Sequence, residues 1–309
     1  MNTQELRIIV SGTNGFVGRN LCPYLIKKNH KIIALSSLRS NNDLTVKEFL
    51  NDSNKEVISN FMPNCFIHLA GIAHESAINK STESLIREVN GELPLKLVKK
   101  CNDYGINKFI FLSTIGVHGS SSTQVINESS PIVLNNIYSA TKYHAEQSLK
   151  SYFNELKSTN IFIIRPSLIY GKNAKGNINK LQKLIYSGLP LPFKSINNKR
   201  SLLSIDNLNS ALNTILQSDA TSHETFVLAD KELISTTDLI KIMGISSNVE
   251  SRLFNFPLYL WNFGSRLPYI SKSIRSLTED YIVDSSKFRN TYSWDQKLSQ
   301  KEALHKSFS

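Results

Sequence analysis

The first two-thirds of the chain alternates short apolar runs with longer stretches in which apolar residues recur at helical spacing. The runs CFIHLA, KFIFLS and NIFIIR are almost continuously apolar, which is typical of strands buried on both faces. Leu85, Val89, Leu93 and Leu97 recur every four residues and predict a helix, which Pro94 is expected to kink. The expected strands are 6–11, 31–36, 65–70, 108–113 and 160–165, and further helices are expected over about 14–28 and 138–156.

Strands that alternate with helices in this way build β-α-β units and a parallel sheet. The sequence therefore predicts an α/β fold with a doubly wound parallel sheet. After Pro166 the pattern loosens into glycines, polar loops and shorter elements, including a helix for which Asp206 is the expected N-cap. We therefore expect a first domain over residues 1–170 and a smaller C-terminal substrate-binding domain over 171–309. Some segments of the second are expected to return to the first.

Composition narrows the functional classes. The net charge is +11, but the lysines and arginines are spread along the chain, and no zinc finger, arginine-rich arm or aromatic RNA-binding motif accompanies them. We therefore expect no nucleic-acid partner and interpret the basic surface as solvated and attractive to phosphorylated small molecules. Cys22, Cys65 and Cys101 have neither metal-site nor disulfide spacing, so we expect no metal and a cytoplasmic location.

No stretch is long enough to span a bilayer, so we expect no membrane span. The most apolar segment, residues 253–267 (LFNFPLYLWNFGSRL), contains Pro257, Asn262 and Arg266. We interpret this segment as a packed helix or lid, and a helix lying on a membrane surface is the alternative.

Gly12, Gly15 and Gly18 stand at the first strand-to-helix turn, in the spacing Gly-x-x-Gly-x-x-Gly. Glycines there permit a tight turn, a close approach of backbone to a pyrophosphate and close packing of the helix on the strand. The N-terminus of the helix adds free N–H groups and a positive dipole that favour phosphates. This placement predicts the dinucleotide-binding turn of a Rossmann-type domain.

Tyr138 and Lys142 are four residues apart in a predicted helix, so both side chains face one site. A nearby ammonium stabilises a phenolate and is expected to lower the pKa of the tyrosine. The tyrosine would then exchange a proton with a substrate hydroxyl or ketone. The pair therefore predicts an acid–base site.

These motifs resemble the extended, sugar-nucleotide branch of the short-chain dehydrogenase/reductases, the NAD-dependent epimerase/dehydratase family. Leu69-Ala70-Gly71 resembles its cofactor-facing strand end, and Asn90-Gly91 resembles its Asn-x-x-Gly helix element. Tyr138-Ser-Ala-Thr-Lys142 matches its catalytic Tyr-x-x-x-Lys.

The resemblance implies the remaining site residues. Thr114, five residues before Gly119, would be the third catalytic group, and His118 receives no catalytic role although relatives usually have tyrosine there. The implied catalytic residues are Thr114, Tyr138 and Lys142. The implied cofactor contacts are Gly12, Asn14, Gly15, Phe16, Val17, Gly18, Ser36, Arg39, Leu69, Ala70, Gly71, Asn90, Ser113, Tyr138, Lys142 and Pro166.

The choice of cofactor depends on the end of the second strand, where NAD enzymes commonly place an acid on the ribose 2′-hydroxyl. This chain has Ser36-Ser37-Leu38-Arg39 there, without an acid. Arg39 would meet a 2′-phosphate, helped by Arg19, so NADP(H) is favoured over NAD(H). The other interpretation of Arg39 is a solvated side chain.

The second half carries the substrate prediction. Arg165-Pro166-Ser-Leu-Ile-Tyr170-Gly171 resembles the family's Arg-Pro-x-x-Val-Tyr-Gly. Residues 198–208 resemble bacterial enzymes that act on UDP-linked 4-keto-6-deoxy-N-acetylhexosamines for surface polysaccharides. The resemblance implies that Arg200 grips the diphosphate through its guanidinium. The implied substrate contacts are Thr114, Asn177, Arg200 and Arg275.

Three reactions share such a scaffold. A 4,6-dehydratase normally carries an Asp-Glu pair after the catalytic threonine, and Ile115-Gly116 stand there instead, so dehydration is disfavoured. We predict NAD(P)H-dependent reduction of the C4 ketone of a nucleotide-linked 4-keto-6-deoxy-sugar. A UDP-hexose or UDP-N-acetylhexosamine 4-epimerase with tightly bound NAD is the alternative, and a non-catalytic dinucleotide sensor is the alternative of another class. The oligomeric state stays open, although similar proteins are usually homodimers.

Overall fold

The computed structural model describes residues 4–36, 44–73, 80–174, 176–221, 223–257, 259–261 and 271–309. The chain forms two compact units, each built from three separate stretches. Unit 1 comprises Met1–Val117, Leu134–Arg165 and Ala211–Phe226. Unit 2 comprises His118–Val133, Pro166–Ser210 and Val227–Ser309.

The large sheet has seven strands in the order β3-β2-β1-β4-β5-β6-β9. Each pair from β3 through to β6 is parallel. This arrangement confirms the predicted α/β fold with a doubly wound parallel sheet. The strands are β1 (Arg7–Ser11), β2 (Lys31–Ser36), β3 (Leu44–Thr45), β4 (Cys65–His68), β5 (Lys108–Leu112), β6 (Asn160–Pro166) and β9 (Glu224–Leu228).

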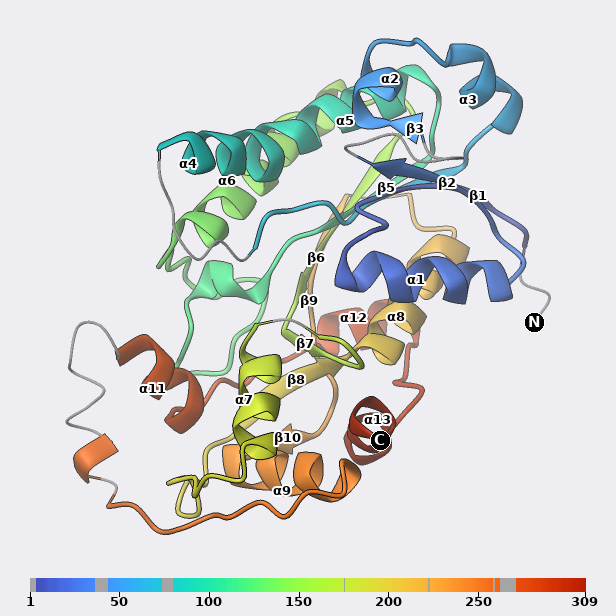
Figure 1. Ribbon diagram of the computed structural model, residues 1–309. Helices are drawn as coiled ribbons and strands as arrows, with labels where there is room; N and C mark the ends of the chain where they lie inside the picture. Colours follow the sequence, from blue (N-terminus) through green and yellow to red (C-terminus); the bar gives the residue numbers. More distant parts are fainter. Residues whose placement is uncertain are drawn as a thin grey trace. The chain divides into compact units, whose positions relative to one another are not determined.

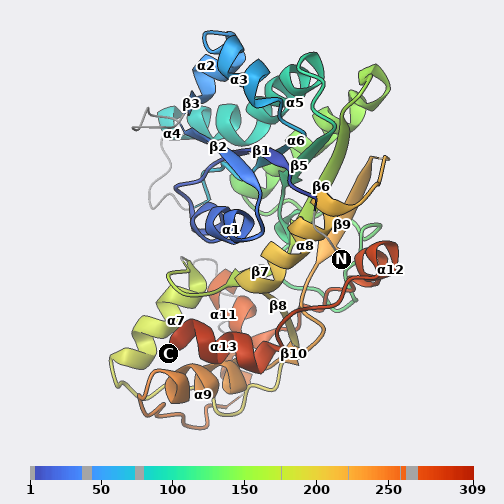
Figure 2. The same cartoon turned by 90° about the vertical axis from the view of Figure 1, so that its right-hand side faces the viewer.

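Helices cover both faces of the sheet, as continuously apolar strands require. Figures 1 and 2 show α5 and α6 along one face and α1 along the other. The helices are α1 (Phe16–Lys27), α2 (Val46–Leu50), α3 (Lys55–Phe61), α4 (Lys80–Ile86), α5 (Leu93–Asp103), α6 (Ile137–Ser151) and α8 (Ile205–Gln217). Shorter 3-10 turns are η2 (Ile115–His118) and η3 (Phe153–Glu155).

The core under α5 and α6 is a row of side chains from neighbouring strands. Phe66 of β4 lies beside Phe109 of β5, which lies beside Ile161 of β6. The rings of Phe66 and Phe109 stack with their centroids 5.3 Å apart. Leu97 of α5 and Leu149 of α6 are fully buried in the same cluster. Burial of this row fixes the strand register, because a shift by one residue would turn every apolar side chain to the opposite face.

The helix predicted around Leu85–Leu97 is one rod with an irregular middle. Between α4 and α5 the backbone adopts a π-helical turn, η1 (Arg87–Glu92), and Pro94 is the second residue of α5. Proline has no N–H to donate to the carbonyl four residues back, and its ring crowds that carbonyl. The wider turn accommodates this proline, so the expected disturbance lies just before Pro94.

Two predicted helix ends are wrong. The helix from Tyr138 ends at Ser151 rather than Leu156, and η3 follows it. Asp206 is not the N-cap of α8: the Ser204 hydroxyl accepts the Asn207 N–H at 3.1 Å, and the Asp206 carboxylate pairs with Lys306 at 2.5 Å. A serine one residue before the helix therefore does the capping that the aspartate was expected to do.

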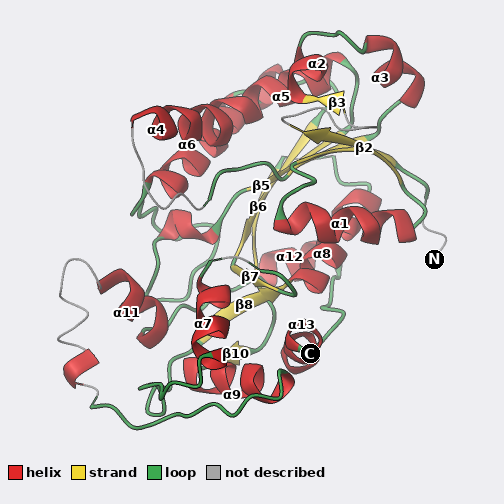
Figure 3. Cartoon of the chain, in the orientation of Figure 1, coloured by secondary structure: helices red, strands yellow, loops and turns green. Residues whose placement is uncertain are grey.

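Unit 2 contains a three-stranded sheet, with β7 and β8 parallel and β10 antiparallel to β8. Figure 3 shows its strands among a surrounding set of helices. The strands are β7 (Leu168–Tyr170), β8 (Arg200–Ser204) and β10 (Leu233–Ile234). The helices are α7 (Asn177–Tyr186), α9 (Thr236–Ser246), α11 (Ser271–Thr278), α12 (Ser286–Tyr292) and α13 (Gln300–Phe308). Nowhere in the described ranges is a helix both long and apolar enough to cross a membrane.

Candidate active site

The strand order reverses between β1 and β4, and open α/β sheets bind ligands outside the carboxyl ends of their strands at such a point. Gly12 follows β1 directly and Ala70 lies two residues past β4. Gly12 has φ +77°, and a Cβ on it would lie 2.5 Å from the Ala70 backbone nitrogen. The two loops therefore touch at a position that only glycine can occupy.

The other two turn glycines differ from each other. A Cβ on Gly18 would lie 2.5 Å from the Gly12 carbonyl oxygen, so α1 packs directly on the turn. Gly15 is exposed, has an ordinary φ of −76° and is the N-cap of α1 without a side-chain hydrogen bond. The exposed turn at Asn14 and Gly15, leading into the N-terminus of a 12-residue helix, fits a pyrophosphate. Phe16 and Val17 are the first two residues of that helix.

Asn90 holds the loop that follows β4. Its fully buried side chain accepts the Ile72 N–H at 2.8 Å and donates to the Ile72 carbonyl at 3.0 Å. This pair of bonds fixes Leu69, Ala70 and Gly71 from behind. The predicted cofactor residue Asn90 thus has both amide groups on the backbone of this loop.

Lys142 lies at the centre of this region and is 2% exposed. Its Nζ donates to the Leu112 carbonyl at 3.0 Å and to the Ala70 carbonyl at 3.4 Å. It also lies 4.7 Å from the centroid of the Phe111 ring. Burial lowers the pKa of Lys142 to about 7, against the opposing effect of the Glu146 carboxylate.

Tyr138 stands one turn before Lys142 on the same face of α6. Burial raises the pKa of Tyr138 to about 12. The sequence predicts a lowered tyrosine pKa, and burial in this structure acts in the opposite direction.

Ser113 and Thr114 are neighbours with different surroundings. The buried Ser113 hydroxyl donates to Glu146 at 2.5 Å, and Glu146 also accepts Nε and Nη2 of Arg165 at 3.0 and 2.5 Å. Glu146 and Arg165 are almost completely buried. Thr114 is half-buried, and its hydroxyl oxygen accepts the Gly116 N–H at 3.1 Å. Ser113 thus belongs to an internal ion-pair network, and Thr114 lies outside that network.

Two further predicted cofactor residues lie at strand ends, and a third lies outside the described residues. Ser36 is buried at the end of β2, and Pro166 is the buried last residue of β6. Arg39, on which the NADP(H) prediction depends, lies outside the described residues.

Sequence reasoning missed one polar pair at the switch point. Ser11 ends β1 and His68 ends β4, and their Oγ and Nδ1 atoms are 2.6 Å apart in a fully buried contact. Burial holds the pKa of His68 well below its usual value, so the imidazole is neutral. The pair links the two strands directly below the loops that touch. Its only signal in the sequence is a polar residue closing each apolar strand.

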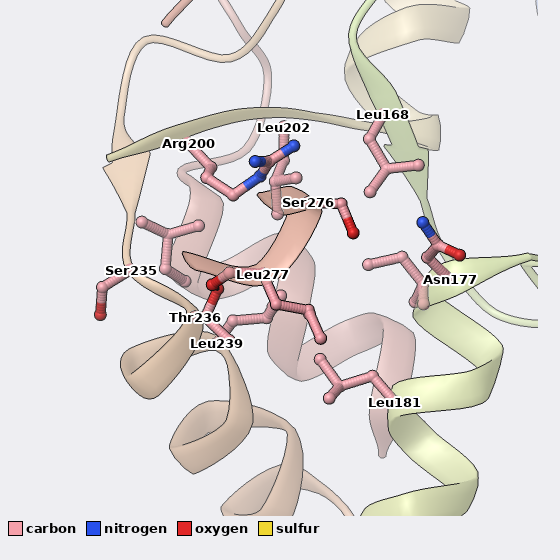
Figure 4. A pocket seen from close by; sticks show the side chains of 12 residues that line it. Leu168, Asn177, Leu181, Arg200, Leu202, Ser235, Thr236, Leu239, Ser276 and Leu277 are labelled. Carbon is pink, nitrogen blue, oxygen red and sulfur yellow. The ribbon is translucent and has the colours of Figure 1, made fainter. Parts of the chain in front are cut away.

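Two of the predicted substrate residues line one cavity of unit 2, with a volume of about 50 Å³. Figure 4 shows the guanidinium of Arg200 above this cavity and Asn177 on another wall. Arg200 donates from Nη1 to the Glu279 carbonyl at 3.0 Å and lies 5.7 Å from the Tyr281 ring centroid. Burial lowers the pKa of Arg200. The remaining walls are mainly leucine and isoleucine, with three hydroxyl side chains: Ser235, Thr236 and Ser276.

Arg275 does not join Asn177 and Arg200 at this cavity. It is exposed on α11 and pairs with Glu279 at 3.7 Å, and its neighbour Ser276 lines the cavity instead. The three hydroxyl residues come from two distant segments and carry no motif, so sequence reasoning missed them.

Residues 8–229 match the model of the NAD dependent epimerase/dehydratase family. The chain belongs to this family. The resemblance inferred from the motifs is thereby confirmed.

Several epimerases are among its relatives. A UDP-glucose 4-epimerase of Vibrio cholerae is 29% identical over 299 residues, which cover 93% of this chain and 90% of that protein. An Escherichia coli O157:H7 N-acetyl-α-D-glucosaminyl-diphospho-ditrans,octacis-undecaprenol 4-epimerase is 23% identical over 258 residues, 83% of this chain and 77% of that protein. The crystal structure of a Bacillus cereus UDP-N-acetylglucosamine 4-epimerase superposes with a TM-score of 0.77 at 17% identity, covering 98% of each chain.

The turn glycines generate a first prediction. Gly18→Ala places a methyl group against the Gly12 carbonyl, so the variant should lose about 2 kcal/mol or more of unfolding free energy. Gly15→Ala should stay within about 1 kcal/mol of the parent, since its Cβ would lie 3.2 Å from the Gly12 carbonyl oxygen, but bind NAD at least about tenfold more weakly, because it adds a methyl group to the exposed turn assigned to the pyrophosphate. Urea unfolding and NAD titration check both. A Gly15→Ala protein that binds NAD as tightly as the parent would contradict this assignment.

The neighbouring hydroxyls give a matched pair. Ser113→Ala removes a hydrogen bond to a buried carboxylate and should cost about 1.5–3 kcal/mol of stability. Thr114→Val should change stability by less than about 1 kcal/mol but lower kcat about 100-fold or more, because a hydroxyl on the reacting oxygen is lost. Unfolding curves and turnover on a nucleotide sugar test the pair. The opposite pattern would exchange the roles of the two residues.

Lys142 is expected to serve catalysis while its burial lowers the stability of the folded protein. Its pKa is about 7 when folded against 10.5 as the ordinary value, so the cost of burying the ammonium is fully present below pH 7 and fades as pH rises towards 10.5. Lys142→Met should therefore be inactive yet more stable at pH 6 by roughly 2 kcal/mol. Its advantage should shrink at pH 9. Lys157→Met, at an exposed position, is the control and should change little. A destabilised Lys142→Met protein at pH 6 would count against the burial argument.

Proposed function

We propose that this protein is a nucleotide-sugar 4-epimerase that works with a nicotinamide dinucleotide. The observation that carries the proposal is the position of Lys142. Its ammonium is held between the carbonyls at the ends of β4 and β5, beside the glycine turn, with Tyr138 one turn away. The names of the relatives from Vibrio cholerae and Escherichia coli support C4 epimerisation as the reaction.

The side chains have distinct roles in this proposal. Tyr138 takes the proton of the C4 hydroxyl and returns it after the sugar has presented its other face. Lys142 supplies the positive charge that a phenolate requires, because burial alone leaves the pKa of Tyr138 at about 12. Thr114 donates a hydrogen bond to the reacting oxygen. When bound, the dinucleotide accepts and returns the hydride.

Dehydration lacks its acid and base here. The two residues after Thr114 are the buried Ile115 and Gly116, which begin the 3-10 turn η2. Neither side chain can transfer a proton. The scaffold therefore favours reactions that leave the C5–C6 part of the sugar intact.

A second candidate is the NAD(P)H-dependent 4-reductase predicted from the sequence. The absence of an acid from Ser36-Ser37-Leu38-Arg39 favours it, because a tightly held NAD is usually anchored by an acid at that place. In this reaction Tyr138 only donates its proton to the nascent C4 alkoxide, with Lys142 and Thr114 in the same roles. The preference for NADP(H) belongs to this candidate.

The substrate's diphosphate is assigned to Arg200 and Asn177 in unit 2. Both epimerase relatives are named for a sugar carried on a diphosphate, whereas the carriers, uridine and undecaprenol, differ. A half-buried guanidinium over a cavity that also carries an amide and three hydroxyl side chains suits that shared group. Unit 1 then has the dinucleotide and unit 2 the substrate carrier.

The fate of the cofactor distinguishes the two candidates. Purified protein is incubated with UDP-GlcNAc or UDP-glucose without added cofactor, and separately with NADH or NADPH and a UDP-4-keto-6-deoxy-N-acetylhexosamine. Interconversion of C4 epimers with no net change in nicotinamide absorbance supports the epimerase. Stoichiometric oxidation of NAD(P)H with the keto sugar supports the reductase instead.

Tyr138→Phe is the control for either outcome. It should lower turnover by about 10²–10⁴-fold while the protein still binds its dinucleotide, since only the proton carrier is lost. A Tyr138→Phe protein with parental turnover would refute the catalytic assignment.

A further inference from the structure

Two stretches of unit 2 contain no acidic residue. No Asp or Glu occurs from residue 171 to 205 or from residue 251 to 278. The first stretch contains Lys172, Lys175, Lys180, Lys183, Lys194, Lys199 and Arg200, and the second contains Arg252, Arg266, Lys272 and Arg275. All eleven Lys, Arg, Asp and Glu side chains of the two stretches are therefore positive, although the whole chain has 25 acidic and 36 basic residues.

The two acid-free stretches lie side by side. The Leu191 N–H donates to the Arg252 carbonyl at 2.8 Å, and the Phe254 N–H donates to the Leu191 carbonyl at 3.0 Å. The Lys194 N–H donates to the Phe254 carbonyl at 3.2 Å. These bonds place residues 191–194 beside residues 252–254, so the charges of Lys194 and Arg252 lie close together.

Large apolar side chains are exposed on this surface. Arg252 and Phe254 alternate with Leu253 in an extended segment, which turns both outward on the same side. Phe254 is 42% exposed and Leu189, on the adjoining strand segment, is 60% exposed. Exposed apolar side chains that gather beside cations on one surface are typical of interaction sites, whereas single exposed apolar residues need no partner.

An aromatic stack holds further apolar side chains beside them. Trp261 stacks on the buried Phe193 with ring centroids 5.4 Å apart, and Phe256 meets the edge of Trp261 at 5.1 Å. This contact ties residues 259–261, which are helical, to the Leu191–Lys194 segment. Tyr259 is 70% exposed and Leu260 39% exposed beside this stack.

Several basic side chains of the two acid-free stretches have no ion-pair partner among the described residues, although Arg275 pairs with Glu279. Lys180, Lys183, Lys194 and Arg252 are all exposed, and within the described ranges none of them forms an ion pair. Elsewhere on the chain, Lys231 pairs with Asp295. The charge of this surface is therefore available to an external anion.

We propose that this surface docks on an anionic phospholipid bilayer. The docking face consists of Leu189, Lys194, Arg252, Phe254, Tyr259 and Leu260. Its exposed aromatic and aliphatic side chains insert at the level of the lipid headgroups, and its cations meet the negative surface charge. A nucleic acid would use the cations but not the exposed leucines, and a protein partner would need acids that nothing in the structure specifies. The proposal does not depend on which reaction unit 1 catalyses.

Sedimentation with lipid vesicles tests the proposal on the whole protein. Vesicles of phosphatidylcholine with phosphatidylglycerol should bind it at least about tenfold more tightly than vesicles of phosphatidylcholine alone, and added salt should weaken that binding. Equal binding to both vesicles, or none to either, overturns the proposal. Binding to single-stranded DNA that matches binding to the anionic vesicles also overturns it, because the partner would then be any polyanion.

Variants separate the two parts of the docking face. Lys194→Glu with Arg252→Glu should weaken vesicle binding about tenfold or more, and Phe254→Ser with Tyr259→Ser should weaken it similarly without removing the salt dependence. The matched control is Ile245→Ser, since Ile245 is 68% exposed at the end of α9, outside both stretches. The control should bind as the parent does, and an equal loss in the control would refute the proposed face.

Turnover on a water-soluble nucleotide sugar should be unchanged in these variants, because none of the substituted residues lies in the catalytic region. Circular dichroism and melting temperature verify their folding. A vesicle result that fails while turnover persists overturns the docking proposal alone, and lost catalysis with intact vesicle binding affects only the proposed function.

Discussion

The burial of one ammonium group is the constraint on which the active region depends. Lys142 cannot keep a charge at 2% exposure without compensation. Compensation comes from the carbonyls of Ala70 and Leu112, and from the Glu146 carboxylate one turn further along α6. Each partner lies on a different element, so β4, β5 and α6 must all be in place before the charge is tolerated. The charge that chemistry requires is thus also a demand on the packing of unit 1.

The buried network below Lys142 meets part of that demand. Glu146 is itself a buried charge, and three donors from Ser113 and Arg165 satisfy it. A buried ion pair rarely adds net stability, but removal of one partner is costly because the other charge stays behind. The pair therefore fixes the position of α6 on the sheet: it joins the end of β6 to the face of α6 that carries Tyr138 and Lys142. Positioning of the catalytic face is the advantage that balances its cost.

The sequence predicted what depends on local pattern and left open what depends on contacts. Continuous apolar runs identified the strands of the sheet other than β3 and β9, and glycine spacing identified the turn after β1, because both reflect short-range rules. The sequence could not show that Ser113 bonds a buried carboxylate, since that partner, Glu146, lies 33 residues away. It likewise placed the cap of α8 on Asp206, whose carboxylate is engaged by Lys306, 100 residues further on. The direction of the Tyr138 pKa also depends on burial, which a four-residue spacing does not encode.

The distribution of charge also depends on contacts that the sequence does not show. Lysines and arginines are spread along the sequence, which suggested an evenly solvated surface. Spacing along a chain does not determine the field at a surface, because the field depends equally on where acids are absent. Two stretches without acids become one surface when backbone hydrogen bonds join Leu191 and Lys194 to Arg252 and Phe254. Apolar side chains exposed on such a surface are unfavourably solvated in water, and their burial is favourable only at an interface that also accepts cations. An anionic bilayer meets both conditions, which is why charge and exposure together favour it over either a polyanion or a neutral apolar partner.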